Sequence, residues 1–132
     1  MTLCDAGPLF ALIDPRQAAP HAACKAVLPR LSSPLITTWP SFAEAMYLAG
    51  RAGGWPMQRL LWGFVERDAL AIHESGPVEV RRMLGLMEQY RDTPMDLADA
   101  SLVAVAEVVG LSRIFTLDGH FRLYRIAGSG VD

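Results

Sequence analysis

The chain has 132 residues and a net charge of −2, and 52% of its residues are hydrophobic while 20% are charged. This composition supports a full hydrophobic core and excludes a disordered chain. The length suits one domain, which we expect over residues 1–132. No apolar run approaches the roughly 18 residues that cross a bilayer, and no signal peptide opens the chain, so we expect a cytoplasmic protein without membrane contact.

The small net charge does not point to a nucleic-acid binder. Eleven of the twelve basic residues are nevertheless Arg, whose forked guanidinium suits phosphate; a GC-rich genome explains the same bias equally well. The two cysteines, Cys4 and Cys24, form no CxxC pair. We expect both to be small core residues in a reducing compartment.

The first half of the chain alternates short apolar strands with helical segments. Pro8, Pro20 and Pro40 each stand near the start of a helical stretch, where proline is tolerated, and Gly53-Gly54 closes the third one. In chain order we expect a strand over 2–6, helices over 8–13 and 21–28, a strand over 35–38, and helices over 40–53 and 56–66.

The second half continues this alternation. Apolar side chains recur at helical spacing in the segment 78–90, and Gly110 follows the apolar residues of the next helix. In chain order we expect a strand over 70–73, a helix over 78–90, a helix that begins at Thr93-Pro94, a strand over 113–117, a short helix over 120–124 and a fifth strand near 125–127.

Strands separated by helices predict an α/β fold in three layers, with helices on both faces of a mostly parallel sheet of four to five strands. Ligands of such sheets bind beyond the carboxyl ends of the strands. Asp5 and Asp118 both stand at expected strand ends. We therefore expect them to converge on one crevice although they are far apart in sequence.

Carboxylates in apolar surroundings are the most informative feature of the chain. Four of them, each on a separate expected core element, are Asp5, Glu44, Asp99 and Asp118. Such groups are almost never fully buried unless they are paired or bound to a metal, so the four suggest one shared site for a hard cation. Structural alternatives exist: Asp5 could cap the first helix, although Gly7 is the better-placed cap. Glu44 could form a reciprocal cap with Ser41, and Asp118 could belong to a turn.

Asp96 and Asp99 share one face of their helix because they are three residues apart. The segment Thr93-Pro94-Met95-Asp96 is typical of a helix start, in which Thr93 caps the helix and Pro94 is its first residue. Asp96 is therefore either part of this cap or an auxiliary member of the site. The helix beyond Asp99 is apolar nearly all round and should be buried, where a carboxylate costs several kcal/mol without a partner or metal. Asp99 is therefore the strongest single candidate. Thr116 could orient a neighbouring carboxylate.

The chemistry of these donors points to one kind of cation. An all-oxygen site suits Mg²⁺ or Mn²⁺ rather than Zn²⁺, and His21, His73 and His120 are too scattered for zinc. Such a cation supports phosphodiester hydrolysis by activating a water. No Walker loop, nucleophile elbow or GxGxxG pattern offers another chemistry, and an aspartyl phosphatase would need an acid where Gly7 follows Asp5.

Four short motifs occur in order along nearly the whole chain. They are Leu3-Cys4-Asp5-Ala6-Gly7-Pro8-Leu9, then Thr37-Thr38 with Phe42-Ala43-Glu44-Ala45, then the segment 94–107 around Asp96 and Asp99, and finally Thr116-Leu117-Asp118 with Phe121. Together they resemble the PIN domains, and within them the VapC-like toxins of bacterial toxin–antitoxin pairs. The segment 126–132 is more Gly-rich and polar than the apolar ending that this resemblance leads us to expect.

The resemblance implies an active site and its partners. The implied catalytic acids are Asp5, Glu44, Asp99 and Asp118, of which Asp5, Asp99 and Asp118 would bind Mg²⁺ or Mn²⁺, with Asp96 and Thr116 as auxiliary residues. It also implies an RNA substrate, a cognate antitoxin and a homodimer.

Three arginines near the fourth acid, Arg113, Arg122 and Arg125, are candidates for contacts with RNA phosphates. The expected function is a divalent-metal-dependent endoribonuclease that acts as the toxin of a type II toxin–antitoxin pair. The alternative is a non-catalytic RNA- or protein-binding module of the same fold.

Overall fold

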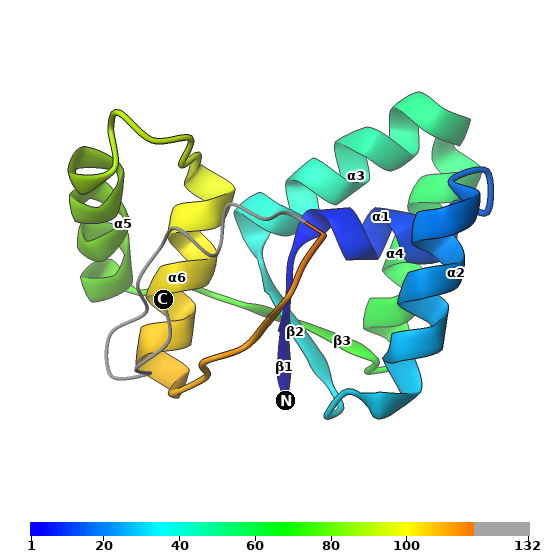
Figure 1. Cartoon of the computed structure of the whole chain (residues 1–132), viewed down its shortest axis with the longest axis horizontal. Coiled ribbons are helices and arrows are strands. Elements are labelled where there is room, and N and C mark those ends of the chain that lie inside the picture. The colour runs from blue at the N-terminus through cyan, green and yellow to red at the C-terminus, as the bar shows by residue number, and fades with distance from the viewer. Residues whose placement is uncertain (118–132) are drawn as a thin grey trace.

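The computed structural model describes residues 1–117 and shows a sheet between two groups of helices (Figure 1). The strands are β1 (Thr2–Cys4), β2 (Leu35–Thr38), β3 (Leu70–His73) and β4 (Ile114–Phe115). They lie in the order β3-β2-β1-β4, and every neighbouring pair is parallel. The helices are α1 (Ala6–Ile13), α2 (Ala18–Val27), α3 (Trp39–Gly53), α4 (Trp55–Glu66), α5 (Pro77–Gln89) and α6 (Leu97–Val109), with a short 3₁₀ turn, η1 (Leu28–Arg30), after α2. The expected three-layer α/β fold is confirmed.

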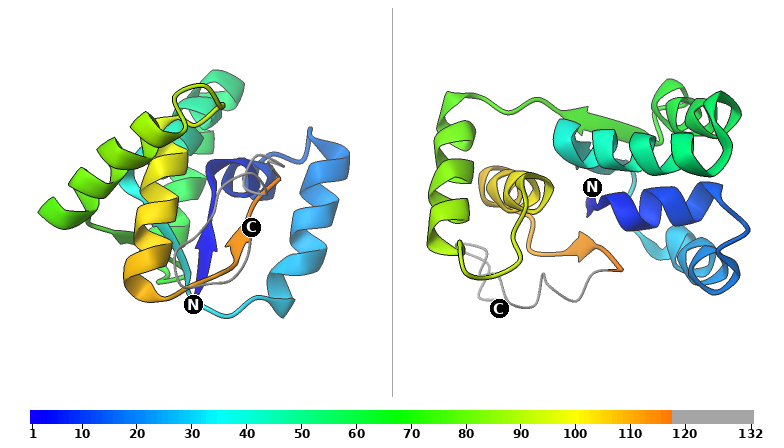
Figure 2. Two further views of the ribbon diagram at one scale, coloured as in Figure 1. Left: turned by 60° about the vertical axis from the view of Figure 1, so that its left-hand side comes forward. Right: turned by 90° about the horizontal axis from the view of Figure 1, so that it is seen from above.

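Each face of the sheet has its own hydrophobic core, because successive residues of a strand point to opposite sides. Leu3 and Ile36 pack with buried residues of α5 and α6. Cys4 and Leu35 pack on the other face with residues of α1, α3 and α4. Figure 2 shows α5 and α6 on one side of the sheet and the first four helices on the other. Helices therefore cover both faces of the sheet, and a ligand can reach it beyond the ends of the strands.

All four helices in the first half begin one to three residues earlier than expected, α2 at Ala18 and α4 at Trp55 among them. In α1 and α3 a side chain in front of the proline caps the helix. α1 begins at Ala6 rather than at Pro8, and Asp5 is its N-cap. For the same reason β1 ends before Asp5 instead of continuing through Ala6. α3 begins at Trp39, and the hydroxyl of Thr38 caps it.

α6 begins at Leu97, later than the Thr93-Pro94 start that the sequence predicts, and Asp96 is its N-cap. Every residue from Ala98 to Ala106 is buried, as the apolar sequence of this helix leads one to expect. The helix ends at Gly110, which adopts the left-handed conformation with φ 73°. β4 is shorter than the expected strand over 113–117, and the helix and strand expected over 120–124 and 125–127 lie outside the described residues.

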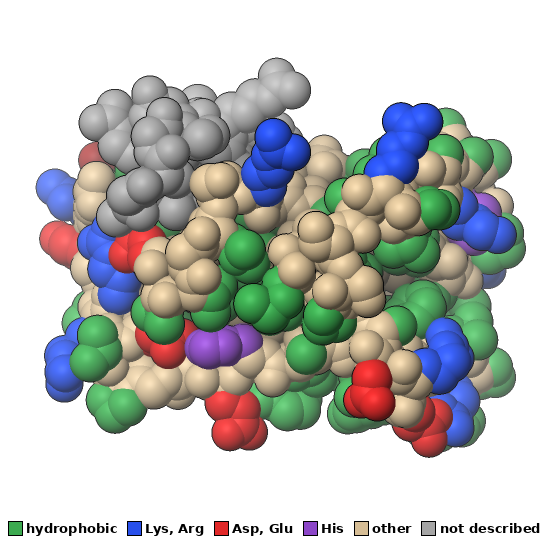
Figure 3. Space-filling view, turned by 90° about the horizontal axis from the view of Figure 1, so that it is seen from below, with side chains coloured by type: hydrophobic (Ala, Val, Ile, Leu, Met, Phe, Trp, Pro, Cys, Tyr) green, Lys and Arg blue, Asp and Glu red, His purple; other side chains and the backbone are tan. Residues whose placement is uncertain are grey.

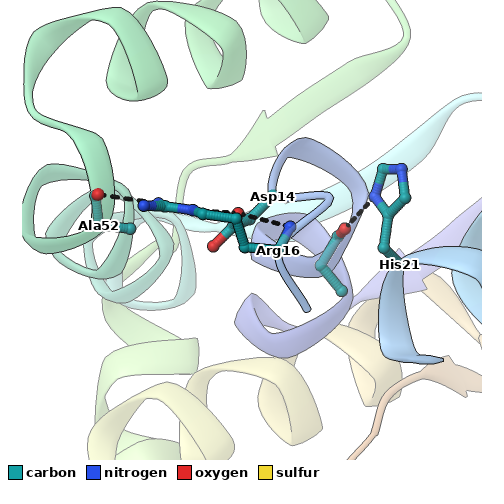
Figure 4. A network of polar contacts seen from close by, with 5 residues as sticks. Asp14, Arg16, His21 and Ala52 are labelled. Atoms are coloured by element: carbon teal, nitrogen blue, oxygen red, sulfur yellow. Dashed lines mark hydrogen bonds and ion pairs between the residues drawn. The ribbon is translucent and has the colours of Figure 1, made fainter. Parts of the chain in front are cut away.

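Polar contacts hold the elements around α1 together (Figure 4). The buried Asp14 carboxylate accepts from Arg16 Nε at 2.9 Å and from the Arg16 backbone N–H at 3.1 Å. The Arg16 guanidinium in turn donates to the Ala52 carbonyl on α3 at 2.8 Å. His21 Nδ1 lies 2.7 Å from the Ala11 carbonyl. These contacts fix the ends of α1, α2 and α3 relative to one another.

Figure 3 shows the molecule from below the view of Figure 1. On this side, Lys and Arg side chains are dispersed among hydrophobic ones rather than gathered into one basic patch. Within residues 1–117 no helix combines the length and the hydropathy that crossing a bilayer requires.

Candidate active site

Polar residues form a row at the carboxyl ends of β2, β1 and β4. The register of the parallel pairs, continued past the strand ends, brings Asp5 level with Thr38 and Thr116. The backbone N–H of Asp5 donates to the Phe115 carbonyl at 3.0 Å, which carries the pairing of β1 and β4 beyond the last strand residues. This row occupies the edge at which parallel α/β sheets bind their ligands.

Asp5 is only 7% exposed, and both of its carboxylate oxygens accept hydrogen bonds. Oδ1 accepts from the backbone N–H of Ala6 at 2.7 Å, which makes Asp5 the cap of α1. Oδ2 accepts from the hydroxyl of Thr116 at 2.9 Å. The capping alternative is therefore realised. An ionised carboxylate has about four acceptor positions, and these two contacts use one position on each oxygen.

Asp96 and Asp99 form a reciprocal capping box at the start of α6. Asp96 Oδ1 accepts from the backbone N–H of Asp99 at 2.8 Å, and Asp99 Oδ2 accepts from the backbone N–H of Asp96 at 3.2 Å. Asp96 is exposed, whereas Asp99 is 7% exposed. The geometry accounts for Asp96 as a helix cap. It leaves Asp99 as a buried carboxylate at the positive end of the helix.

Hydroxyl groups connect this helix start to the row of polar residues. Thr38 Oγ1 and Ser101 Oγ lie 2.6 Å apart, and Ser101 Oγ donates to the Ala98 carbonyl at 2.7 Å. Thr38 and Ser101 are both fully buried. The turn of α6 that carries Asp99 is thus attached to the carboxyl end of β2. Asp5 follows the carboxyl end of the neighbouring strand β1, so both acids belong to the same end of the sheet.

Glu44 lies in the second turn of α3 and is exposed, so the expectation of a carboxylate in apolar surroundings is wrong for this residue. Its sequence neighbours Phe42 and Ala45 are buried, but a helix turns successive residues to different sides. The structural alternative for Glu44, a reciprocal cap with Ser41, is not formed either, because the cap of α3 is Thr38, which accepts from the Ser41 backbone N–H at 3.4 Å.

The remaining site predictions fall at or beyond the end of the described chain. Asp118, Arg122 and Arg125 lie outside the described residues. Arg113 is described, is exposed, and lines a hollow of about 450 Å³ beside β4 that extends to Thr116.

The two thiols are unsuited to nucleophilic chemistry. Burial raises the pKa of the Cys4 thiol well above its usual value, and the negative charge of Asp5 raises it further. Burial also raises the pKa of Cys24. Because the thiolate is the reactive form, neither thiol is a candidate nucleophile.

The donors present fit a hard divalent cation. Asp5 and Asp99 supply only oxygen atoms, which are the ligands that Mg²⁺ and Mn²⁺ prefer, and burial of these charges is costly without compensation. Within residues 1–117 no three His, Cys, Asp or Glu side chains form a group that could hold a metal. The expected third ligand, Asp118, is the first residue beyond that range.

Sequence reasoning missed two residues of this edge, Thr38 and Ser101. Thr38 directly precedes Trp39-Pro40, and that position before a proline at the start of a helix was a usable signal for a cap. Ser101 gave no local signal, because its partner is 63 residues away in sequence.

The fold and this edge together define a class: a parallel three-layer α/β protein with a carboxylate site at the carboxyl ends of its central strands. The sequence pattern of the PIN domain matches residues 2–127, and the chain belongs to the PIN domain family. The expected family is therefore confirmed.

A solved structure shares this fold over nearly the whole length of both chains. The crystal structure of VapC20 from Mycobacterium tuberculosis, described as a toxin that cleaves the sarcin–ricin loop, matches with a TM-score of 0.82 at 14% sequence identity. The match covers 100% of this chain and 97% of that one. No curated protein sequence matches the chain.

Proposed function

We propose that this protein is a divalent-cation-dependent endoribonuclease of the cytoplasm and the toxin of a type II toxin–antitoxin pair. The observation that carries the proposal is the pair of buried carboxylates, Asp5 and Asp99, at the ligand-binding edge of a PIN-domain sheet. The similarity in fold to a toxin that cleaves an RNA loop supports the same substrate class.

In this proposal Asp5 and Asp99 hold the cation, together with Asp118. When bound, the cation lowers the pKa of a water and stabilises the charge that develops on the leaving oxygen. The Thr116 hydroxyl fixes the orientation of Asp5 by donating to Oδ2. Glu44 completes the catalytic acids; its exposure on α3 suits a group that meets the incoming substrate rather than one that stays buried.

Arg113 is the described candidate for contact with the RNA backbone, alongside Arg122 and Arg125. The hollow that it lines contains a second arginine, Arg30, and the N-terminal residue Met1, and no acidic residue of the described chain lines it. Four other arginines form ion pairs with carboxylates, whereas within residues 1–117 neither Arg30 nor Arg113 does. Two uncommitted guanidinium groups beside β4 suit the phosphates of a strand that leads away from Thr116.

A cognate antitoxin is the second proposed partner. An apolar hollow of about 190 Å³ opens between α1, the end of α2 and α4, and its lining includes Leu12, Leu28 and Phe64. A wider hollow next to it shares Leu12 and Phe64 and adds Arg67, together with Arg59 and its ion-pair partner Glu66. An apolar floor with Arg67 at its side suits a peptide segment with hydrophobic anchors and an acidic flank. Co-expression with the product of the neighbouring open reading frame, followed by co-purification, tests this partner.

The proposed homodimer needs an apolar contact surface as well. Val80, Leu84 and Met87 follow one another at helical spacing along α5, and each is exposed although it is hydrophobic. Such a stripe supports self-association. Light scattering of the purified chain, with and without Leu84→Glu, measures the oligomeric state.

The decisive experiment for the activity incubates the purified protein with structured RNA and Mg²⁺ or Mn²⁺, with and without EDTA. Asp99→Asn should lower the cleavage rate at least about 100-fold. Loss of a group that only orients a metal ligand already lowers activity by about 10- to 100-fold, and loss of the ligand itself should lower it at least as much. Asp92→Asn, the same change at an exposed position, should cleave like the wild type. Equal cleavage by wild type and Asp99→Asn, or cleavage that resists EDTA, contradicts the proposal. RNA binding without cleavage by the wild type would support the non-catalytic module.

A further inference from the structure

A chain of buried hydroxyl groups joins β2 to the start of α6. Ser101 Oγ donates to the Ala98 carbonyl at 2.7 Å, and Thr38 Oγ1 lies 2.6 Å from Ser101 Oγ. A serine hydroxyl has one proton to donate. Since Ser101 donates its proton to Ala98, Thr38 must donate to Ser101.

Thr38 has a second partner in this arrangement. Its Oγ1 accepts from the backbone N–H of Ser41 and caps α3. The single Thr38 hydroxyl thus contacts α3 through its acceptor side and α6 through its proton. Both helices carry proposed catalytic acids: Glu44 lies on α3 and Asp99 on α6.

We propose that Thr38 and Ser101 are positioning residues of the metal site, which hold the first turn of α6, and with it Asp99, in register with Asp5. This inference rests on the proposed metal-dependent function. Ala98 precedes Asp99 directly, so the hydrogen bond from Ser101 to the Ala98 carbonyl acts on the peptide unit that places the Asp99 backbone. Thr38 stands level with Asp5 in the sheet, so the hydroxyl pair attaches the turn that carries Asp99 to the strand position beside Asp5.

The neighbouring Thr37 separates this role from ordinary core packing. Thr37 and Thr38 are adjacent on β2 and both have no exposed surface. The Thr37 hydroxyl donates to the Cys4 carbonyl at 2.8 Å within the sheet, whereas the Thr38 hydroxyl leaves the sheet for α6. Replacement of either threonine by valine removes one buried hydroxyl from β2. Only the replacement of Thr38 also breaks the hydrogen bond between β2 and α6.

The test measures Mn²⁺ binding to the metal-free full chain by titration calorimetry, together with the thermal midpoint in EDTA. Thr38→Val and Ser101→Ala should each raise the Kd for Mn²⁺ about ten- to a hundredfold, the usual range for groups that orient metal ligands. The double variant should bind no more weakly than the weaker single variant, because both changes break one connection. Thr38→Ser keeps the hydroxyl and should restore the wild-type Kd.

Thr37→Val is the matched control: it should lower the thermal midpoint in EDTA without changing the Kd for Mn²⁺. Wild-type Kd values in Thr38→Val and Ser101→Ala, or an equal loss in Thr37→Val, overturn the positioning role while leaving the proposed nuclease intact. Failure of the wild type to bind Mn²⁺ and to cleave RNA overturns the proposed function and this inference together.

Discussion

Replacement of Asp96 decides whether its carboxylate is a helix cap or a member of the metal site. Asp96→Ala removes the acceptor for the Asp99 backbone N–H, a bond of 2.8 Å. The reverse bond survives, because it runs from the Asp96 backbone N–H to Asp99 Oδ2 at 3.2 Å. Loss of one N-cap contact costs about 1 kcal/mol. With a urea m-value of about 2 kcal/mol per M, the unfolding midpoint should fall by about 0.5 M, and the thermal midpoint by about 4 °C.

Asp96→Asn is the informative comparison, because the amide oxygen still accepts the bond while the charge is lost. In urea unfolding of the metal-free protein, followed by circular dichroism in EDTA, it should keep the wild-type midpoint within a few tenths of a kcal/mol. Its Kd for Mn²⁺ should also be that of the wild type. An unchanged midpoint for Asp96→Ala would refute the capping argument, and a Kd at least tenfold weaker for Asp96→Asn would make Asp96 a ligand.

Three further changes test other parts of the structure. Thr116→Val removes the donor to Asp5 Oδ2 and should weaken Mn²⁺ binding about tenfold in calorimetry; an unchanged Kd contradicts that role. The hydrogen bond from the Arg16 side chain lowers the pKa of Asp14, so Asp14 contributes stability above its unfolded pKa of about 3.9 that is lost as pH falls through the folded pKa. Asp14→Asn should therefore lose stability less steeply below about pH 4 in acid unfolding, and parallel curves would contradict this. Arg30→Ala with Arg113→Ala should reduce the salt dependence of RNA affinity, measured in EDTA, by about 1.4 in log–log slope, or about 0.7 per phosphate contact; the exposed Arg81→Ala should leave it unchanged.

The order of strands and helices was predictable because each element carries its own pattern. The expected strands over 35–38 and 70–73 agree with β2 and β3, since short apolar runs between polar turns leave little choice of boundaries. The all-round apolar sequence after Asp99 predicted a buried helix, and every residue of α6 from Ala98 to Ala106 is buried. These features are local, so a single sequence contains them.

Helix starts are less predictable from the sequence, because a proline near the start of a helix does not mark its first residue. Proline is also tolerated within the first turn, and the residues before it compete for the cap. At α3 the polar side chain of Thr38 stands directly before Trp39-Pro40, and it is this side chain that caps the helix. Glu44 was misjudged for a related reason: apolar neighbours in sequence indicate burial only when they share a helix face with the residue in question.

In the proposed function, Asp5 and Asp99 each combine a structural role as part of a helix cap with a role in metal binding. Each carboxylate lies at a helix N-terminus and accepts a backbone N–H there, and this one bond uses only part of the acceptor capacity of a carboxylate. A helix N-terminus stabilises a carboxylate by about 0.3–1 kcal/mol, and by about 2 at most, whereas burial of the charge costs several kcal/mol. Capping therefore lowers the cost of keeping these acids ionised without removing it. In the proposed function a bound divalent cation contributes to offsetting this cost, and the contacts that cap α1 and α6 also hold the two carboxylates in place for it.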